Sequence, residues 1–125
     1  MKKIVLHDYG GFSFAFQLAE FLAEKNNIVY YLHGGAMQAV QRSKLNSKKT
    51  NFFIDSVTTE KPFAKYQLIK RWLQEKEYGN KLVKKIRHIN PDIIISATSP
   101  LDVQNIIFKK IDSKNINFIF WWQDI

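Results

Sequence analysis

Residues 1–24, MKKIVLHDYGGFSFAFQLAEFLAE, decide the fold of this chain. They contain an apolar run at residues 4–6, a turn that carries Gly10 and Gly11, and then apolar residues at helical spacing. The order predicts a strand, a glycine turn and a helix. Open α/β sheets bind anionic ligands at such turns, because glycines let a ligand approach the main chain and the first helical amides lack partners. Neither G-x-G-x-x-G nor the Walker A sequence is present.

The composition limits the class of protein. A chain of 125 residues with 46% hydrophobic and 24% charged residues is the size and composition of one globular domain. No apolar run approaches the roughly 20 residues that cross a bilayer, and the N-terminus does not resemble a signal peptide. We therefore expect a cytoplasmic protein. The absence of cysteine excludes disulfides, and no group of His, Asp and Glu has zinc-ligand spacing, so we predict no metal and no tightly bound cofactor.

The formal charge of +8 allows two interpretations. It could attract an anionic surface such as a membrane, a phosphorylated substrate or a nucleic acid, or the lysines could occupy solvated faces. The aromatic residues lie within apolar periodic segments, which predicts that they are core, and no RNP-like strand is present. Nucleic-acid binding is therefore the weaker alternative. The aromatic residues concerned are Phe14, Phe16, Phe21, Trp72 and Phe118.

The spacing of apolar residues and turn signals predicts alternating strands and helices. The first helix begins near Ser13, a good N-cap residue, and ends at Asn26 and Asn27, one of which adopts the left-handed conformation. A long helix at about 63–89 follows Pro62, carries Ile69 and Leu73 in one apolar stripe, and is broken or kinked near Gly79 and Asn80. Further strands are predicted at 28–32, 52–54, 93–95 and 118–122, and a further helix begins at Pro100.

This β-α-β-β-α-β-α-β order predicts an α/β fold with a doubly wound, mostly parallel sheet in a single domain, residues 1–125. Right-handed crossovers place four turns along one edge of the sheet, at residues 10–11, 34–35, 96–100 and 123–124. The candidate functional residues of the chain converge on this edge. A basic surface loop at residues 38–50 lies between two of the strands.

His7 and Asp8 end the first strand, where a general base could reach a bound hydroxyl. The structural alternative, which we favour, is that His7 bonds the backbone of the turn and Asp8 caps it. Ser99 could be a nucleophile, but the G-x-S-x-G elbow is missing, so helix capping is favoured. Asp124, at the end of the last strand, is equally suited to ligand contact and to capping a following helix.

Three separate segments resemble the N-terminal, acceptor-binding domain of family 4 glycosyltransferases, which have the GT-B fold. The first is DYGGFSFAFQLAEFLAEKNNIVYYL at residues 8–32, where a Gly-Gly turn leads into a Leu-Ala helix. The second and third are NPDIIISATSPLDVQNI at residues 90–106 and NFIFWWQDI at residues 117–125. Residues 36–78 lie outside the resemblance.

The resemblance implies roles for individual residues. Gly10 and Gly11, with Phe12 beside them, would lie against the diphosphate of a nucleotide-sugar co-substrate or shape the cleft where acceptor meets donor. Ser99 and Asp124 would face a lipid-linked or glycan acceptor. The basic loop, with Lys44 and Lys48, would approach that acceptor at an anionic membrane surface, which makes the protein peripheral to the membrane. The reaction would serve cell-surface polysaccharide or lipid-linked glycan assembly.

The resemblance also implies a missing half. The family's second domain carries the nucleotide-sugar site, and none of its residues is present. We therefore expect a domain truncated at its C-terminal end that works with a C-terminal donor-binding domain or a partner chain and is inactive alone. The alternatives are a non-enzymatic, flavodoxin-like module that binds a partner protein and a basic nucleic-acid-binding domain.

Overall fold

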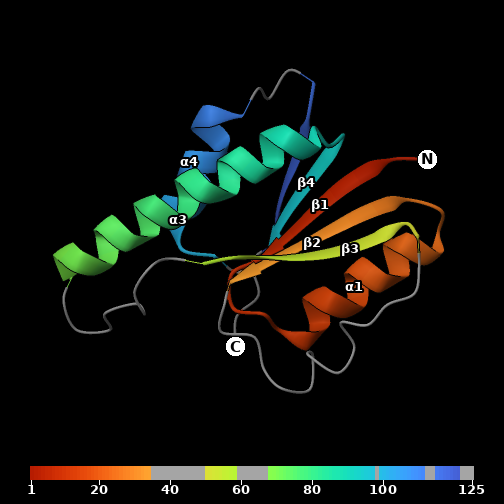
Figure 1. Ribbon diagram of the computed structural model, residues 1–125, viewed down its shortest axis with the longest axis horizontal. Helices are drawn as coiled ribbons and strands as arrows, with labels where there is room; N and C mark the ends of the chain where they lie inside the picture. The colour runs from red at the N-terminus through yellow and green to blue at the C-terminus, as the bar shows by residue number, and fades with distance from the viewer. Residues whose placement is uncertain (35–49, 59–67, 98, 112–114, 122–125) are drawn as a thin grey trace.

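A computed structural model describes residues 1–34, 50–58, 68–97, 99–111 and 115–121 (Figure 1). Residues 38–49 of the basic loop and Asp124 lie outside these ranges. The strands and helices alternate along the chain as the sequence predicts. In chain order they are β1 (Lys3–Asp8), α1 (Ser13–Glu24), β2 (Ile28–Gly34), β3 (Phe52–Val57), α3 (Leu68–Ile89), β4 (Ile93–Ala97), α4 (Leu101–Lys110) and β5 (Asn117–Trp121).

The five strands form one sheet in the order β3-β2-β1-β4-β5. Every pairing is parallel, so the predicted α/β, doubly wound fold is confirmed and the sheet is parallel throughout. This is the strand order of Rossmann-like domains, whereas flavodoxin-like domains have the order 2-1-3-4-5. The flavodoxin-like alternative is therefore wrong in its topology. In this protein β3 pairs with β2 at the edge of the sheet, whereas in the flavodoxin-like order β3 lies beside β1.

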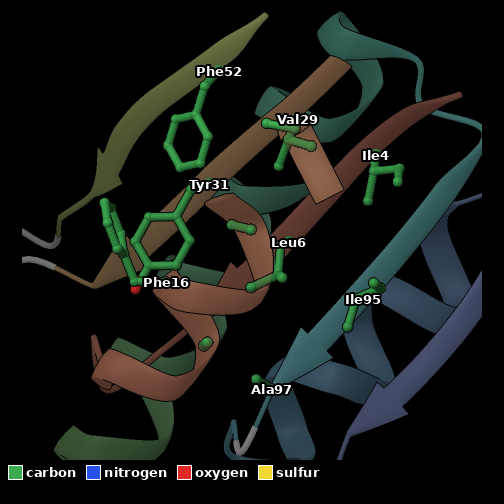
Figure 2. Packing of buried hydrophobic residues seen from close by; sticks show 11 residues of the cluster. Ile4, Leu6, Phe16, Val29, Tyr31, Phe52, Ile95 and Ala97 are labelled. Atoms are coloured by element: carbon green, nitrogen blue, oxygen red, sulfur yellow. The ribbon is translucent and has the colours of Figure 1, made fainter. Parts of the chain in front are cut away.

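The sheet is covered on both faces (Figure 1). On one face α1 packs Phe16 against Tyr31 of β2 and Phe52 of β3, with ring centroids 5.2 and 5.7 Å apart (Figure 2). On the other face α3 and α4 pack Leu82, Ile86 and Ile107 against the sheet. Strands buried on both faces are near-continuous apolar runs, which is why Ile93–Ile95 in β4 identified a central strand.

The ends of α1 test two predictions. Asn26 has φ of 65°, so the left-handed residue predicted after the helix is confirmed. Ser13 is the first helical residue, and Phe12 occupies the N-cap position with no side-chain cap hydrogen bond among the described residues. The prediction of Ser13 as N-cap is therefore wrong. A carboxylate one turn earlier, that of Asp8, accepts the Phe12 amide.

The long helix α3 runs unbroken from Leu68 to Ile89, so the predicted break at Gly79 and Asn80 is wrong. Gly79 is buried where α3 meets α4, and an added Cβ would lie 2.9 Å from Cδ1 of Ile106. Close helix approach therefore explains this glycine. The predicted stripe through Ile69 and Leu73 is also wrong, because both side chains are exposed.

The aromatic residues predicted to be core divide into three groups. Phe16 is fully buried, and Phe14 and Phe118 are partly buried against the two core clusters. Phe21 and Trp72 are exposed, so the prediction is wrong for both. Within the described ranges, no helix is long and apolar enough to cross a membrane.

The contact between α3 and α4 gives a first testable prediction. Gly79→Val should lower the free energy of unfolding by about 1–3 kcal/mol, because its methyl groups must displace Ile106. Urea denaturation measures the change. Combining it with Ile106→Ala should cost less than the sum of the two single changes, since the truncated side chain makes room.

Lys84→Val is the matched control, because Lys84 is exposed on the same helix. It should lose only the difference in helix propensity, a few tenths of a kcal/mol. Equal losses for Gly79→Val and Lys84→Val would contradict the close-approach explanation.

Candidate functional site

Buried polar side chains gather where β1 and β4 end. The sheet is parallel, so these strands share one carboxyl edge, and the register pairs Asp8 of β1 with His33 of β2 on one side and Ala97 of β4 on the other. Burying polar groups costs free energy unless they are hydrogen-bonded, so their partners determine what the cluster can do. The buried polar residues at this edge are His7, Asp8, His33, Ser96 and Ser99.

Asp8 joins three elements through one oxygen. Its Oδ2 accepts hydrogen bonds from the backbone amide of Phe12, at 2.6 Å, and from the hydroxyl of Tyr31, at 2.8 Å. The end of β1 is thereby tied to the start of α1 and to β2. A carboxylate below a helix N-terminus also interacts favourably with the helix dipole. The expectation that Asp8 caps the turn is confirmed.

Two opposing effects act on the Asp8 carboxyl. Burial raises its pKa above the usual value and is the larger effect, while the hydrogen bonds from Tyr31 and the turn amides of Phe12, Gly11 and Gly10 lower it. Its second oxygen, Oδ1, is buried without a hydrogen-bond partner among the residues described. The turn is thus organised around a carboxylate of the protein itself. The Phe12 amide is engaged by that carboxylate, and an anionic ligand at the turn would also face its charge.

Two different structural constraints explain why glycine occupies three positions at this edge. Gly11 has φ of 69°, in the left-handed region that side chains disfavour. A Cβ on Gly10 would overlap the ring of Phe12, and one on Gly34 would overlap the carbonyl oxygen of Tyr9. The protein's own atoms therefore occupy the space beside Gly10 and Gly34. Gly11 is the glycine that the turn's backbone requires.

His7 is fully buried and uses both ring nitrogens. Nε2 lies 2.9 Å from the Tyr78 hydroxyl, and Nδ1 lies 3.1 Å from Ser96 Oγ and 3.2 Å from Ser99 Oγ. These partners come from α3, β4 and the turn before α4. The expectation that His7 bonds the backbone of its own turn is wrong, because its partners are side chains from distant parts of the chain.

The contacts around His7 are consistent with one set of donors and acceptors. Ser99 donates to the carbonyl of Ala97 at 3.0 Å, and Ser96 donates to Ser99 at 3.4 Å. Both donors are then accommodated by the tautomer that carries the proton on Nδ1 and accepts from Tyr78 at Nε2. Burial, with a smaller contribution from the charge of His33, lowers the pKa of His7 to about 3. The imidazole is therefore neutral at physiological pH.

Sequence reasoning missed Tyr31 and Tyr78 as partners of this cluster. Tyr31 lies in an apolar strand and Tyr78 in the apolar stripe of α3, so both resemble core residues. Both are in the core, and burial raises the pKa of each hydroxyl, which keeps them protonated donors. A phenol in an otherwise aliphatic stripe requires a hydrogen-bond partner, and this is the signal that could have identified them.

The predicted site residues fall into two groups. His7, Asp8, Gly10, Gly11 and Phe12 share the β1 end of the carboxyl edge, and Ser99 joins them through His7. Ser99 is buried, and α4 begins after Pro100 with no side-chain cap in the described structure, so its predicted capping role is wrong. The other predicted site residues, Lys44, Lys48 and Asp124, lie outside the described residues.

No protein-family model matches this sequence, and no curated protein matches it. Solved structures do match in fold. The C-terminal domain (residues 83–215) of PF1911 hydrogenase from Pyrococcus furiosus has a TM-score of 0.66 at 17% identity, covering 95% of this chain and 89% of its own. The enzyme WbmH of Bordetella bronchiseptica, solved in complex with NAD⁺, has a TM-score of 0.58 at 11% identity, covering 98% and 55%. Likeness at this level establishes a Rossmann-like fold.

Rossmann-like folds often hold dinucleotides, but the residues at this edge differ from those of a dinucleotide site. Such sites have a G-x-G-x-x-G turn with free amides, and a carboxylate about 20 residues later holds the ribose. Here the Phe12 amide is bonded to Asp8, and β2 ends in Leu32, His33 and Gly34. These residues do not fit a dinucleotide. In the described part of the chain, no group of three potential ligands could hold a metal.

The buried imidazole predicts a pH dependence of stability. Below about pH 6.5 the unfolded chain protonates His7 while the folded chain does not until about pH 3, so stability is lost as pH falls through this window. The loss due to His7 approaches about 1.4 kcal/mol per pH unit. The raised pKa of Asp8 acts oppositely at acidic pH, so His7 must be isolated by comparison with a variant.

Urea denaturation of the wild type and of His7→Gln between pH 7 and pH 4 isolates the contribution of His7 to the free energy of unfolding. The stability advantage of the wild type should shrink as pH falls, because glutamine does not titrate. A constant difference over this range would contradict a buried, neutral His7.

Proposed function

We propose that this Rossmann-like domain is the acceptor-binding domain of a nucleotide-sugar-dependent glycosyltransferase that builds lipid-linked or cell-surface glycans. The observation that carries the proposal is the register of the sheet. It pairs Asp8 of β1 with Ala97 of β4, and Ala97 with Trp121 of β5. Each of the three segments that resemble family 4 glycosyltransferases therefore contributes one of these neighbouring residues to one carboxyl edge, where open α/β sheets bind ligands.

The chain's part in such a reaction is to bind and orient. The acceptor hydroxyl oxygen would form a bond to the anomeric carbon of the donor sugar, the bond from that carbon to the diphosphate would break, and the hydroxyl proton would pass to a base. Holding the acceptor in line with the donor contributes by removing orientational freedom before the reaction. The donor would be held by a separate domain or partner chain.

Neither His7 nor Asp8 is suited to be the base in this arrangement. Both are fully buried, and both nitrogens of His7 already have partners. Asp8 engages Phe12 and Tyr31. We assign both as positioning residues, which hold the β1–α1 turn and the start of α4 in place. Gly11 is itself buried, so the acceptor would contact the partly exposed residues on either side of it, Gly10 and Phe12.

Nucleic-acid binding is the second candidate, favoured only by the charge of +8. The described sheet argues against it, because its exposed aromatic side chains, Phe53 and Phe120, lie on the opposite edge strands β3 and β5 and do not form one stacking surface. A steep fall of affinity for single-stranded RNA with rising salt would favour this candidate over sugar transfer.

The proposal predicts that Gly11 is needed for acceptor binding. A soluble, short-chain polyprenyl diphosphate disaccharide is a suitable probe, with calorimetry as the measurement. Gly11→Val should weaken binding about tenfold or more, since valine is strained at φ of 69° and would distort the turn.

Asn26→Val is the matched control. Asn26 has φ of 65° but lies before β2, at the opposite edge of the sheet, so the variant carries similar strain away from the site. It should bind the probe as the wild type does. Equal weakening by both variants, or no binding by the wild type, would contradict the proposal.

A second prediction concerns turnover. The chain alone should transfer no sugar from UDP- or GDP-linked donors to this probe, because the proposal places donor binding elsewhere. Thin-layer or mass-spectrometric product analysis tests this. Measurable transfer would show that the chain holds its own donor site and would contradict the proposal that a separate domain or partner chain binds the donor.

A further inference from the structure

A groove lies between the N-terminal turns of α3 and α4. These helices pack side by side on one face of the sheet (Figure 1). The groove has a volume of about 420 Å³, which is within the range of small-molecule sites. Pro100 lines it and directly follows Ser99, so the groove adjoins the carboxyl edge of the sheet. Its polar lining residues are Arg71, Glu75 and Asp102, and its apolar ones include Trp72, Pro100 and Leu101.

An ion pair shapes the polar side of the groove. Glu75 is buried, and its Oε1 accepts a hydrogen bond from Nε of Arg71 at 3.1 Å. This bond uses one N–H of the guanidinium, and the other N–H groups of Arg71 have no hydrogen-bond partner in the described ranges. A guanidinium is planar and rigid, so anchoring one nitrogen directs the others. The groove therefore offers oriented hydrogen-bond donors.

Hydrogen-bond acceptors and an aromatic ring complete the lining. Asp102 is exposed in the first turn of α4, and its carboxylate has no hydrogen-bond partner among the residues described. Trp72 is 44% exposed, so a large part of its ring is accessible to a ligand. Pro100 and Leu101 add apolar surface. One small groove thus combines donors, acceptors and a flat apolar surface.

Tyr9 connects the groove to the glycine turn. It precedes Gly10, and its ring packs edge to face against Tyr78 of α3, with the ring centroids 5.0 Å apart. Burial raises the pKa of Tyr9 to about 12, and the charge of Glu75 contributes to this rise. Glu75 is a lining residue of the groove. A ligand in the groove would therefore lie beside the candidate site.

The lining distinguishes between classes of ligand. An anion could use the donors of Arg71 but would face the carboxylates of Glu75 and Asp102. A cation could use the carboxylates but would face Arg71, and the ammonium of Lys76 already lies 3.7 Å from the centre of the Trp72 ring. A hydroxyl group both donates and accepts hydrogen bonds. A neutral compound with several hydroxyls is therefore the class that uses the whole lining.

We propose that this groove is a binding subsite for a neutral saccharide, with a sugar ring against Trp72 and sugar hydroxyls bonded to Arg71 and Asp102. A pyranose suits such a lining, because its C–H face is apolar and its rim carries hydroxyls. Small-molecule sites combine apolar and aromatic surface with a few placed polar groups in this way. The inference deepens the proposed function, because it locates the sugar of the acceptor, and for that meaning it rests on the proposed function.

Proton–nitrogen correlation spectra of the ¹⁵N-labelled chain test the subsite with free disaccharides. The indole N–H signal of Trp72 is identified by its loss in Trp72→Phe. At least one of chitobiose, lactose and maltose should shift this signal and the backbone amide of Leu101, which also lines the groove. Sodium diphosphate and tetramethylammonium chloride, an anion and a cation probe, should leave both signals in place.

Variants identify the groups that bind. Trp72→Ala should weaken binding of the disaccharide about tenfold, because it removes the ring on which the sugar lies. Glu75→Gln should weaken it about threefold, because Arg71 loses the charge that orients it. The shift of the Leu101 amide measures both affinities. Circular dichroism establishes that each variant is folded.

Phe108→Ala and Glu77→Gln are the matched controls. Phe108 is an aromatic residue near the other end of α4 and is 56% exposed. Glu77 lies outside the groove and forms an ion pair at 3.1 Å with Lys81, which is also four residues further along α3. Both variants should bind the disaccharide as the wild type does.

Three results would overturn the proposal. They are no shift of the Trp72 signal with any of the disaccharides, a larger shift with sodium diphosphate or tetramethylammonium, and equal binding by Trp72→Ala and the wild type. Failure of the subsite is distinguishable from failure of the proposed function, because free disaccharides carry no diphosphate. A chain that binds them but not the diphosphate-linked probe would support the subsite and contradict the acceptor-binding function.

Discussion

The hydrogen bonds of one buried carboxylate hold the carboxyl edge of this domain together. Asp8 ends the central strand, and its Oδ2 accepts from the amide that starts α1 and from a tyrosine hydroxyl of the neighbouring strand. Burying a carboxylate is costly, and burial does raise its pKa. Its partners offset that cost only while the turn keeps its shape. The position of α1 over the sheet and the conformation of the glycine turn therefore depend on this interaction.

A second buried network extends the same organisation across the sheet. His7, next to Asp8 in the chain, points to the opposite face and joins Tyr78 of α3 with the serines beside β4. Adjacent residues of a strand face opposite sides of the sheet, so Asp8 holds α1 on one face and His7 holds α3 on the other. His7 and Asp8 therefore stabilise the packing of the helices on the sheet. The surface that remains for a ligand is formed by the partly exposed Gly10 and Phe12 and by the start of α4.

Sequence reasoning succeeded where local signals were strong. The apolar runs of β1 and β4, the turn glycines and Asn26 identified the elements and the doubly wound order, because parallel strands buried on both faces have continuous apolar sequences. The sequence-based predictions were wrong where contacts between distant elements determine the role of a residue. Gly79 resembles a helix breaker, yet it marks the approach of α4. Ile69 and Leu73 have the spacing of core residues, yet both side chains are exposed.

The sequence predicted where the candidate site lies, but not which contacts its side chains make. Parallel strands bring His7, Asp8 and Ser99 to one edge, and this follows from topology alone. Which side chains turn inward does not follow, since it depends on partners that are distant in sequence, such as Tyr31 and Tyr78. The sequence suggested that the glycines leave room for a ligand. The structure fills the space beside Gly10 with Phe12.

Amide chemical shifts of the ¹⁵N-labelled chain, recorded as a short-chain polyprenyl diphosphate disaccharide is added, measure directly whether an acceptor binds at the carboxyl edge. Shifts are expected at Gly11, in the first turn of α4 and at Trp121, because the ends of β1, β4 and β5 lie side by side at the carboxyl edge. Shifts confined to the opposite edge, around Lys3 and Asp92, would contradict it, as would no shift at saturating probe.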